Sequence, residues 1–162
     1  MLDNMTFFID DFIEISEKNS IDFYILSQDE SKPIFSNLFQ KFFSNRLSLE
    51  KPVEIPLWQF LNKENSVGVH LPNAANHREL FLNKLPEMKN IYFLFDLEFS
   101  NKILKFNCLN DLVTILEDSY NFNFYIFDES FSFLLSWSKD ETLFGSGKAI
   151  DLVLKIKESW IL

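Results

Sequence analysis

The sequence predicts an α+β fold in which an antiparallel sheet has helices packed on one face. Three observations support this class. Residues 91–95 form a continuous apolar and aromatic run, which is typical of a strand covered on both faces. Residues 110–120 carry apolar side chains at helical spacing, and residues 122–137 alternate as a hairpin does. Because 162 residues can bury a sizeable core, we expect a single domain over residues 1–162.

An amphipathic helix is expected near the N-terminus. From Thr6 to Lys18 the apolar side chains Phe8, Phe12 and Ile15 recur at helical spacing, and Thr6 is a candidate cap. Such a helix would bury this stripe and leave its other faces to solvent.

A strand and a second helix are predicted next. Residues 21–26 indicate a short strand, and residues 27–31 indicate a polar loop. Pro33 occupies a favoured first-turn position for a helix that runs through Phe43. Prolines exclude a long helix between residues 47 and 56, so we expect an extended connection there.

The middle of the chain gives shorter signals. We expect a short helix at residues 57–61, a brief strand at 67–71, a polar turn at 73–76 and a short helix at 77–85. No internal repeat or low-complexity linker is visible in this region. A domain boundary near residue 50 or 73 is the alternative, but neither half indicates a core of its own, so we expect one domain.

The clearest strand-helix-hairpin unit runs over residues 91–157. A strand that contains Leu104 and Phe106 is expected to pair with the preceding apolar strand. Asn110 is the candidate cap of the following helix, whose apolar stripe reaches Tyr120.

An aromatic hairpin is predicted to follow this helix. Its strands are residues 122–127 and 131–137, both with alternating apolar positions. A glycine turn at residues 145–147 then leads into a closing amphipathic segment.

Phenylalanine is unusually frequent, with 20 copies in the chain. Asn, Lys and Ile are also abundant, as an AT-rich coding sequence would give. The phenylalanines therefore either fill core positions or form an aromatic recognition surface.

The net charge is −9 and is unevenly distributed. Residues 1–30 hold eight acidic side chains against Lys18 alone, and residues 91–162 hold eleven acids against six bases. An acidic surface repels nucleic acid phosphates and anionic membranes, and it attracts basic partners. We therefore expect a basic protein partner rather than nucleic acid or a membrane.

Two groups of acidic side chains are the predicted partner-binding residues. The first follows i, i+4, i+7 spacing on the N-terminal helix, with one further acid beside it. The second comprises two pairs, one at each end of the strand at residues 131–137. Solvated faces and turns are the alternative interpretation of both groups. The predicted residues are Asp10, Asp11, Glu14, Glu17, Asp128, Glu129, Asp140 and Glu141.

No motif indicates a catalytic, cofactor or metal site. His70 and His77 are seven residues apart and Cys108 is the only cysteine, whereas a zinc site needs closer ligand pairs. Residues 145–148 lack the first glycine and the preceding strand of a phosphate loop. We predict no catalytic residue, no cofactor and no metal.

The chain is expected to stay in the cytoplasm. Its first eleven residues carry acids where a signal peptide needs a basic flank. Charges interrupt every apolar run short of the roughly 20 residues that a membrane span requires. A single cysteine also permits no internal disulfide.

Five packing segments within residues 91–151 carry a resemblance. They are Ile91–Phe95, Asp111–Val113, Phe124–Asp128, Leu134–Trp137 and Leu143–Gly147. In these segments the chain resembles the C-terminal half of small bacterial α+β proteins grouped with toxin-immunity and SMI1-type families. The resemblance implies a partner-binding protein, such as an immunity protein that neutralises a cognate toxin in the cytoplasm.

These observations lead to one hypothesis and two alternatives. The hypothesis is a non-enzymatic immunity protein whose acidic surface binds a basic, nuclease-like bacterial toxin. A nuclease must be basic to hold phosphates, so an acidic protein is attracted to the same groove and blocks it. The alternatives are a regulatory or structural protein-interaction module of unknown partner and, ranked last, a small enzyme.

Overall fold

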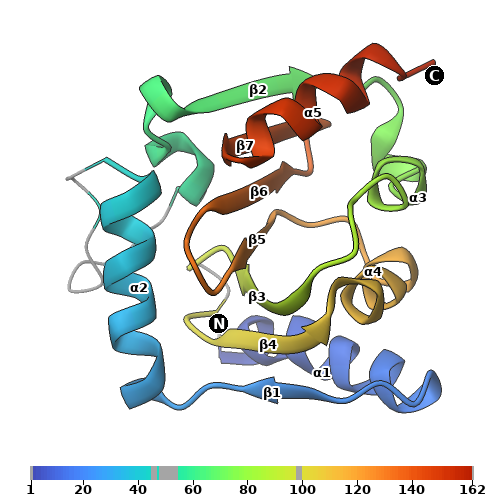
Figure 1. Cartoon of the computed structure of the whole chain (residues 1–162). Coiled ribbons are helices and arrows are strands. Elements are labelled where there is room, and N and C mark those ends of the chain that lie inside the picture. Colours follow the sequence, from blue (N-terminus) through green and yellow to red (C-terminus); the bar gives the residue numbers. More distant parts are fainter. Residues whose placement is uncertain (1, 45–46, 48–54, 98–99, 162) are drawn as a thin grey trace.

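The computed structural model describes residues 2–44, 47, 55–97 and 100–161. In this part of the chain, antiparallel strands form one seven-stranded sheet (Figure 1). The spatial order is β1-β4-β3-β5-β6-β7-β2, so β1 and β2 are the two edge strands. The strands are β1 (Phe23–Ile25), β2 (Ser66–His70), β3 (Lys89–Phe95), β4 (Ile103–Cys108), β5 (Phe124–Asp128), β6 (Phe133–Ser138) and β7 (Thr142–Gly147).

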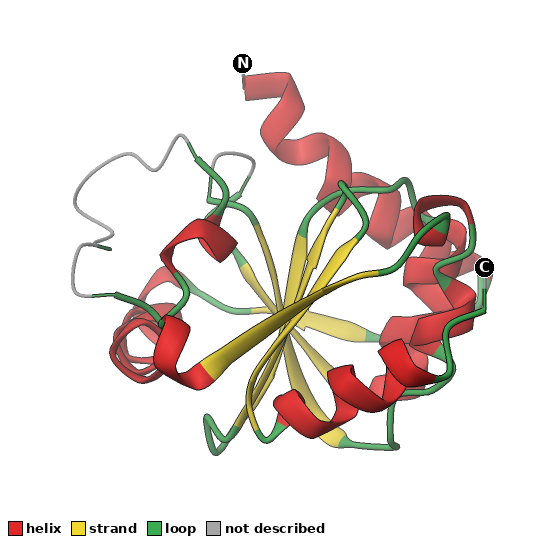
Figure 2. Cartoon of the chain, turned by 90° about the horizontal axis from the view of Figure 1, so that it is seen from above, coloured by secondary structure: helices red, strands yellow, loops and turns green. Residues whose placement is uncertain are grey.

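Helices cover both faces of this sheet (Figure 2). One face carries α1 (Leu2–Lys18), α3 (Glu79–Leu82), α4 (Leu109–Asp118) and α5 (Ala149–Glu158). The other face carries α2 (Gln28–Phe42) and the 3-10 turn η1 (Leu57–Phe60). Two further 3-10 turns, η2 (Lys63–Asn65) and η3 (Ala74–Asn76), flank β2. The predicted α+β class with an antiparallel sheet is confirmed, and α2 adds a layer on the second face.

The alternation of side chains along β3 explains the two cores. Ile91, Phe93 and Phe95 point into the core under α1 and α4, whereas Leu94 points into the core under α2. All four side chains are buried, so the strand reads as a continuous apolar run. Each such side chain contributes roughly 1.5–3 kcal/mol through burial.

Aromatic packing fixes α1 on the sheet. The fully buried ring of Phe12 lies 5.0 Å from that of Phe93 and 5.1 Å from that of Phe95, centroid to centroid. Among the described side chains, Phe7 is the only strongly exposed phenylalanine. The phenylalanines therefore mainly fill the core.

Two predicted helix starts in the N-terminal part are wrong. Helix α1 begins at Leu2, so Thr6 lies inside it rather than at its cap. The predicted loop at residues 27–31 is the start of α2, where the Ser27 hydroxyl accepts from Glu30 N and the Glu30 carboxylate accepts from Ser27 N. Pro33 consequently lies inside the helix and not in its first turn.

The second half of the chain departs from expectation at three points. Helix α4 begins at Leu109 with Cys108 at the cap position, so Asn110 is not its cap. Tyr120 lies beyond this helix and is 62% exposed. Residues 145–147 belong to β7 rather than to a turn, because glycine permits close packing: a Cβ at Gly145 would lie 2.5 Å from the Ala149 carbonyl oxygen.

The shorter predicted elements mostly exist. The helix at residues 57–61 is the 3-10 turn η1, the strand at 67–71 is β2, and the helix at 77–85 shortens to α3. The extended connection expected at residues 47–56 lies largely outside the described residues. Across the described chain, no helix has the length and apolar character needed to cross a membrane.

Candidate partner-binding surface

The outer side of α1 carries a row of three exposed carboxylates, Asp10, Glu14 and Glu17, here called the α1 carboxylate row. They stand one helical turn apart and opposite the buried Phe12 and Ile15. The two ion pairs found among the described residues lie elsewhere in the fold. The charge of the row is therefore not neutralised by a described lysine or arginine.

Asp11 differs from its neighbours in the row. Its side chain is half-buried, and its Oδ2 atom has no hydrogen-bond partner among the described residues. Burial, and secondly the charge of Glu14, raise the pKa of Asp11 above its ordinary value. Its negative charge is thus turned toward the body of the protein and is less available to a partner.

A groove of about 730 Å³, here called the edge groove, separates the second half of α1 from β1. Its α1 side includes Ile13 and Glu17, and its other side is formed by residues 21–25. Apolar groups are open to solvent there: Tyr24 is 54%, Ile25 37% and Ile13 36% exposed. The α1 carboxylate row therefore borders, at its Glu17 end, a hollow with apolar contact area.

The backbone of β1 is also open toward this groove, because β1 pairs with β4 on one side only. Leu26 N donates to Ile103 O over 3.0 Å, and hydrogen-bonded positions alternate along an antiparallel ladder. The N–H and C=O groups of Phe23 and Ile25 consequently point away from β4. They form a short free edge beside the groove.

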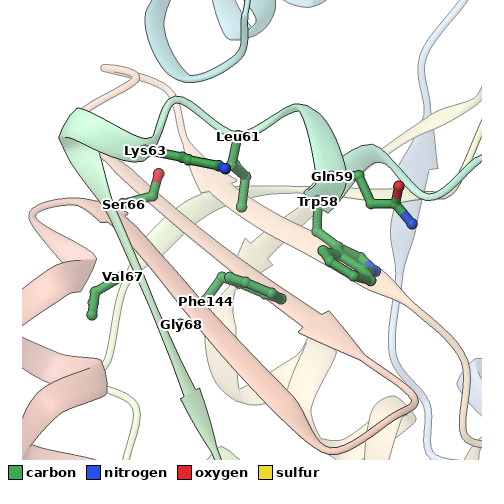
Figure 3. Close-up of a pocket in the computed structure, with 8 residues that line it drawn as sticks. All are labelled: Trp58, Gln59, Leu61, Lys63, Ser66, Val67, Gly68 and Phe144. Atoms are coloured by element: carbon green, nitrogen blue, oxygen red, sulfur yellow. The ribbon is translucent and has the colours of Figure 1, made fainter.

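A second hollow, the Trp58 groove, lies on the opposite part of the sheet and has a volume of about 410 Å³ (Figure 3). The Trp58 indole stacks on the ring of Phe144 at 5.2 Å and an interplanar angle of 18°. Phe144 in turn lies against Gly68, where an added Cβ would come within 2.7 Å of the ring. Lys63 is the charged residue among its described lining, so this groove offers no carboxylate.

Asp128 and Glu129, predicted as partner-binding residues, already have partners within the fold. Asp128 accepts hydrogen bonds from the backbone N–H groups of Ser132 and Phe133 and from the hydroxyls of Ser130 and Ser132. Burial would raise the pKa of Asp128, but these hydrogen bonds outweigh it and lower the pKa. Glu129 forms an ion pair of 3.1 Å with Lys105.

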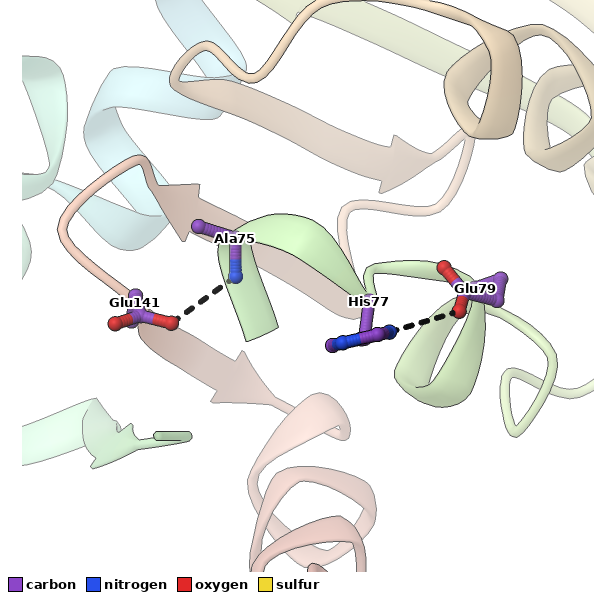
Figure 4. A network of polar contacts seen from close by, with 4 residues as sticks. All are labelled: Ala75, His77, Glu79 and Glu141. Atoms are coloured by element: carbon purple, nitrogen blue, oxygen red, sulfur yellow. Dashed lines mark hydrogen bonds and ion pairs between the residues drawn. The ribbon is translucent and has the colours of Figure 1, made fainter. Parts of the chain in front are cut away.

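Asp140 and Glu141 lie at the other end of β6, about 20 Å away for a six-residue strand. Glu141 holds the turn against η3, since its carboxylate accepts from Ala75 N over 3.1 Å (Figure 4). His77 and Glu79 form a separate pair of 3.5 Å nearby. Asp140 remains exposed. The predicted acids thus occupy separate places, and only Asp10, Glu14 and Glu17 form an uncompensated row.

Sequence reasoning missed the buried carboxylate of Asp96, which is 2% exposed. Its oxygens accept from Leu57 N, from the Tyr125 hydroxyl and from the Asn123 amide at 2.9, 2.5 and 2.8 Å. The Tyr125 hydroxyl also accepts from Trp58 N over 3.0 Å. This network ties η1 to the sheet and so positions Trp58. An acid directly after a buried apolar strand was the available sequence signal.

Within the described chain, no three or more His, Cys, Asp or Glu side chains converge as metal ligands would. His70 and His77 are exposed on separate elements, and Cys108 is half-buried at the start of α4. Comparison of the chain with protein-family models, with curated proteins and with solved structures found no match.

Proposed function

We propose that this protein is a non-enzymatic immunity protein, which binds a basic, nuclease-like toxin in the cytoplasm and neutralises it. The observation that supports this best is the uncompensated α1 carboxylate row beside the edge groove. A protein that holds nucleic acid phosphates needs a basic groove, and a row of carboxylates competes for that groove. Blocking the groove requires no chemistry from the immunity protein.

The surface combines charge with apolar contact area, as protein interfaces do. Charged side chains set the rate of encounter, and buried aromatic or aliphatic anchors supply most of the affinity. Tyr24, Ile25 and Ile13 are the exposed apolar side chains next to the row. The interface therefore centres on α1 and β1, and the acids of the β-turns are secondary.

Growth rescue during co-expression with candidate toxins tests this proposal. The wild-type protein restores growth, and the variant Asp10→Lys/Glu14→Lys/Glu17→Lys does not. The control Glu117→Lys/Asp118→Lys/Glu158→Lys makes the same change in net charge at exposed positions elsewhere and still restores growth. Failure of the wild-type protein to rescue against any toxin encoded beside it contradicts the function. Full rescue by the α1 variant contradicts the interface.

A regulatory or structural interaction module is the second candidate, and the Trp58 groove is the observation that favours it. This groove offers two stacked aromatic rings and Lys63, which a basic toxin would not select. A partner that binds there loses affinity when Phe144 is changed to alanine and is unaffected by reversal of the α1 carboxylate row.

A further inference from the structure

We propose that the free edge of β1 receives an extended, positively charged segment of the partner as an added β-strand. This inference rests on the proposed function and specifies its binding mode. Edge-strand addition uses main-chain hydrogen bonds for affinity and alternate side chains for specificity. The edge groove provides both elements.

The backbone contribution comes from Phe23 and Ile25. Their N–H and C=O groups point away from β4, and no bond to another described residue occupies them. Since β1 has three residues, it accommodates a short segment rather than a long strand. The added strand would extend the sheet order beyond β1.

The two faces of an added strand would meet different side chains. Phe23 and Ile25 point to the face that carries α1, so side chains on that face would contact Ile13 and Glu17. Tyr24 points to the other face, where its hydroxyl donates to the Glu30 carboxylate over 3.2 Å. Each face therefore offers both an apolar or aromatic contact and a carboxylate.

Charge selects the occupant. Glu17 and Asp22 line the groove, and no basic side chain is among its described lining residues. A second copy of this chain would bring the same acids, Glu17 and Asp22, to a groove that already carries them, and like charges repel one another. A strand with lysine or arginine at alternate positions would instead pair with these acids.

The other edge strand of the sheet, β2, is partly covered by the side chain of Lys157 and by α5. Lys157 Nζ donates to the carbonyl oxygen of His70, at the end of β2, over 2.7 Å, and α5 packs beside this strand. Lysines at an edge discourage addition of another strand. Strand addition by a basic segment is therefore favoured at β1.

Peptide titration of the full chain, followed by backbone amide NMR, tests the inference. The probes are the acetylated and amidated peptides Lys-Val-Lys-Val-Lys and Glu-Val-Glu-Val-Glu at low salt. The lysine peptide shifts the amide signals of Phe23 and Ile25 and slows their hydrogen exchange, and the glutamate peptide does neither. Equal effects of both peptides, shifts confined to the α1 carboxylate row, or no shift with either peptide overturn the inference.

Ile25→Pro is the matched variant, because it removes an outward N–H and leaves the β1–β4 ladder in place. We expect at least about tenfold weaker binding of the lysine peptide, as for the loss of one interfacial hydrogen bond. If this variant fails to fold, amide protection in the wild-type chain decides the question. If strand addition is correct, Ile25→Pro restores growth less well than the wild type does; equal rescue by this variant refutes strand addition. If the α1 charge-reversal variant loses rescue in the same experiment, the proposed function is still supported.

Discussion

The hydroxyl of Tyr125 donates a hydrogen bond of 2.5 Å to the carboxylate of Asp96, and both residues are buried. The same carboxylate accepts from Leu57 N and from the Asn123 amide, which join distant parts of the chain. A buried carboxylate is tolerated when its hydrogen-bonding capacity is satisfied. This pair therefore forms a buried polar connection between the sheet and the segment that holds Trp58.

Replacing Asp96 with alanine is expected to destabilise the protein strongly. The change leaves the donors of Leu57, Tyr125 and Asn123 without this acceptor in a buried site, so the free energy of unfolding falls by about 3 kcal/mol or more. Urea denaturation measures this difference. Asp140→Ala, at an exposed position, serves as the control and should remain within about 0.5 kcal/mol of the wild type. Equal stability of the two variants contradicts the structural role of Asp96.

Alkaline pH is expected to destabilise the protein in part through Tyr125. Burial, and secondly the charge of Asp96, raise the pKa of Tyr125 well above its ordinary value of 10.0. Because the unfolded tyrosine loses its proton first, the unfolded state binds fewer protons above about pH 10, and stability falls as pH rises. Unfolding free energies measured at about pH 8 and about pH 11 should differ less in Tyr125→Phe than in the wild type. If the two pH values give the same difference in unfolding free energy in Tyr125→Phe as in the wild type, Tyr125 does not contribute to alkaline destabilisation.

Two glycine-to-alanine substitutions should lower the free energy of unfolding by different amounts, although both add one methyl group. At Gly145 the new Cβ would lie 2.5 Å from the backbone oxygen of Ala149, which the start of α5 holds in place. At Gly68 it would lie 2.7 Å from the side chain of Phe144, which can rotate. We expect Gly145→Ala to lower the free energy of unfolding by about 2 kcal/mol or more, and Gly68→Ala by less. Thermal unfolding with equal costs for both variants contradicts this ranking.

The strands were predictable because their signal is local. The apolar run of β3 and the alternation in β5 and β6 reflect burial of neighbouring residues, and each of these strands lies close to its predicted position. The start of α2 was missed because polar composition at residues 27–31 concealed a capping box, in which Ser27 and Glu30 exchange hydrogen bonds. The polar composition of these residues indicated a loop, whereas their hydrogen bonds form the start of a helix.

The candidate site was predictable only in part, for a related reason. Helical spacing places Asp10, Glu14 and Glu17 in one row, and this requires no knowledge of the fold. The edge groove depends on the pairing of β1 with β4, which are far apart in the sequence. Asp96 likewise gains its role from Leu57 and Tyr125, which lie 39 and 29 residues away. The edge groove and the role of Asp96 therefore depend on contacts between distant residues, which local sequence patterns do not reveal.

The α1 carboxylate row is expected to attract a basic partner, and this attraction is measured by the association rate constant with a toxin identified by growth rescue. Stopped-flow association at increasing ionic strength should show a rate that falls steeply for the wild type and for the Glu117→Lys/Asp118→Lys/Glu158→Lys control. The Asp10→Lys/Glu14→Lys/Glu17→Lys variant should associate at least about tenfold more slowly at low salt, with a weaker dependence on salt. Wild-type association that is insensitive to salt, or an α1 variant that associates as fast as the control, contradicts attraction of the partner by the α1 carboxylate row.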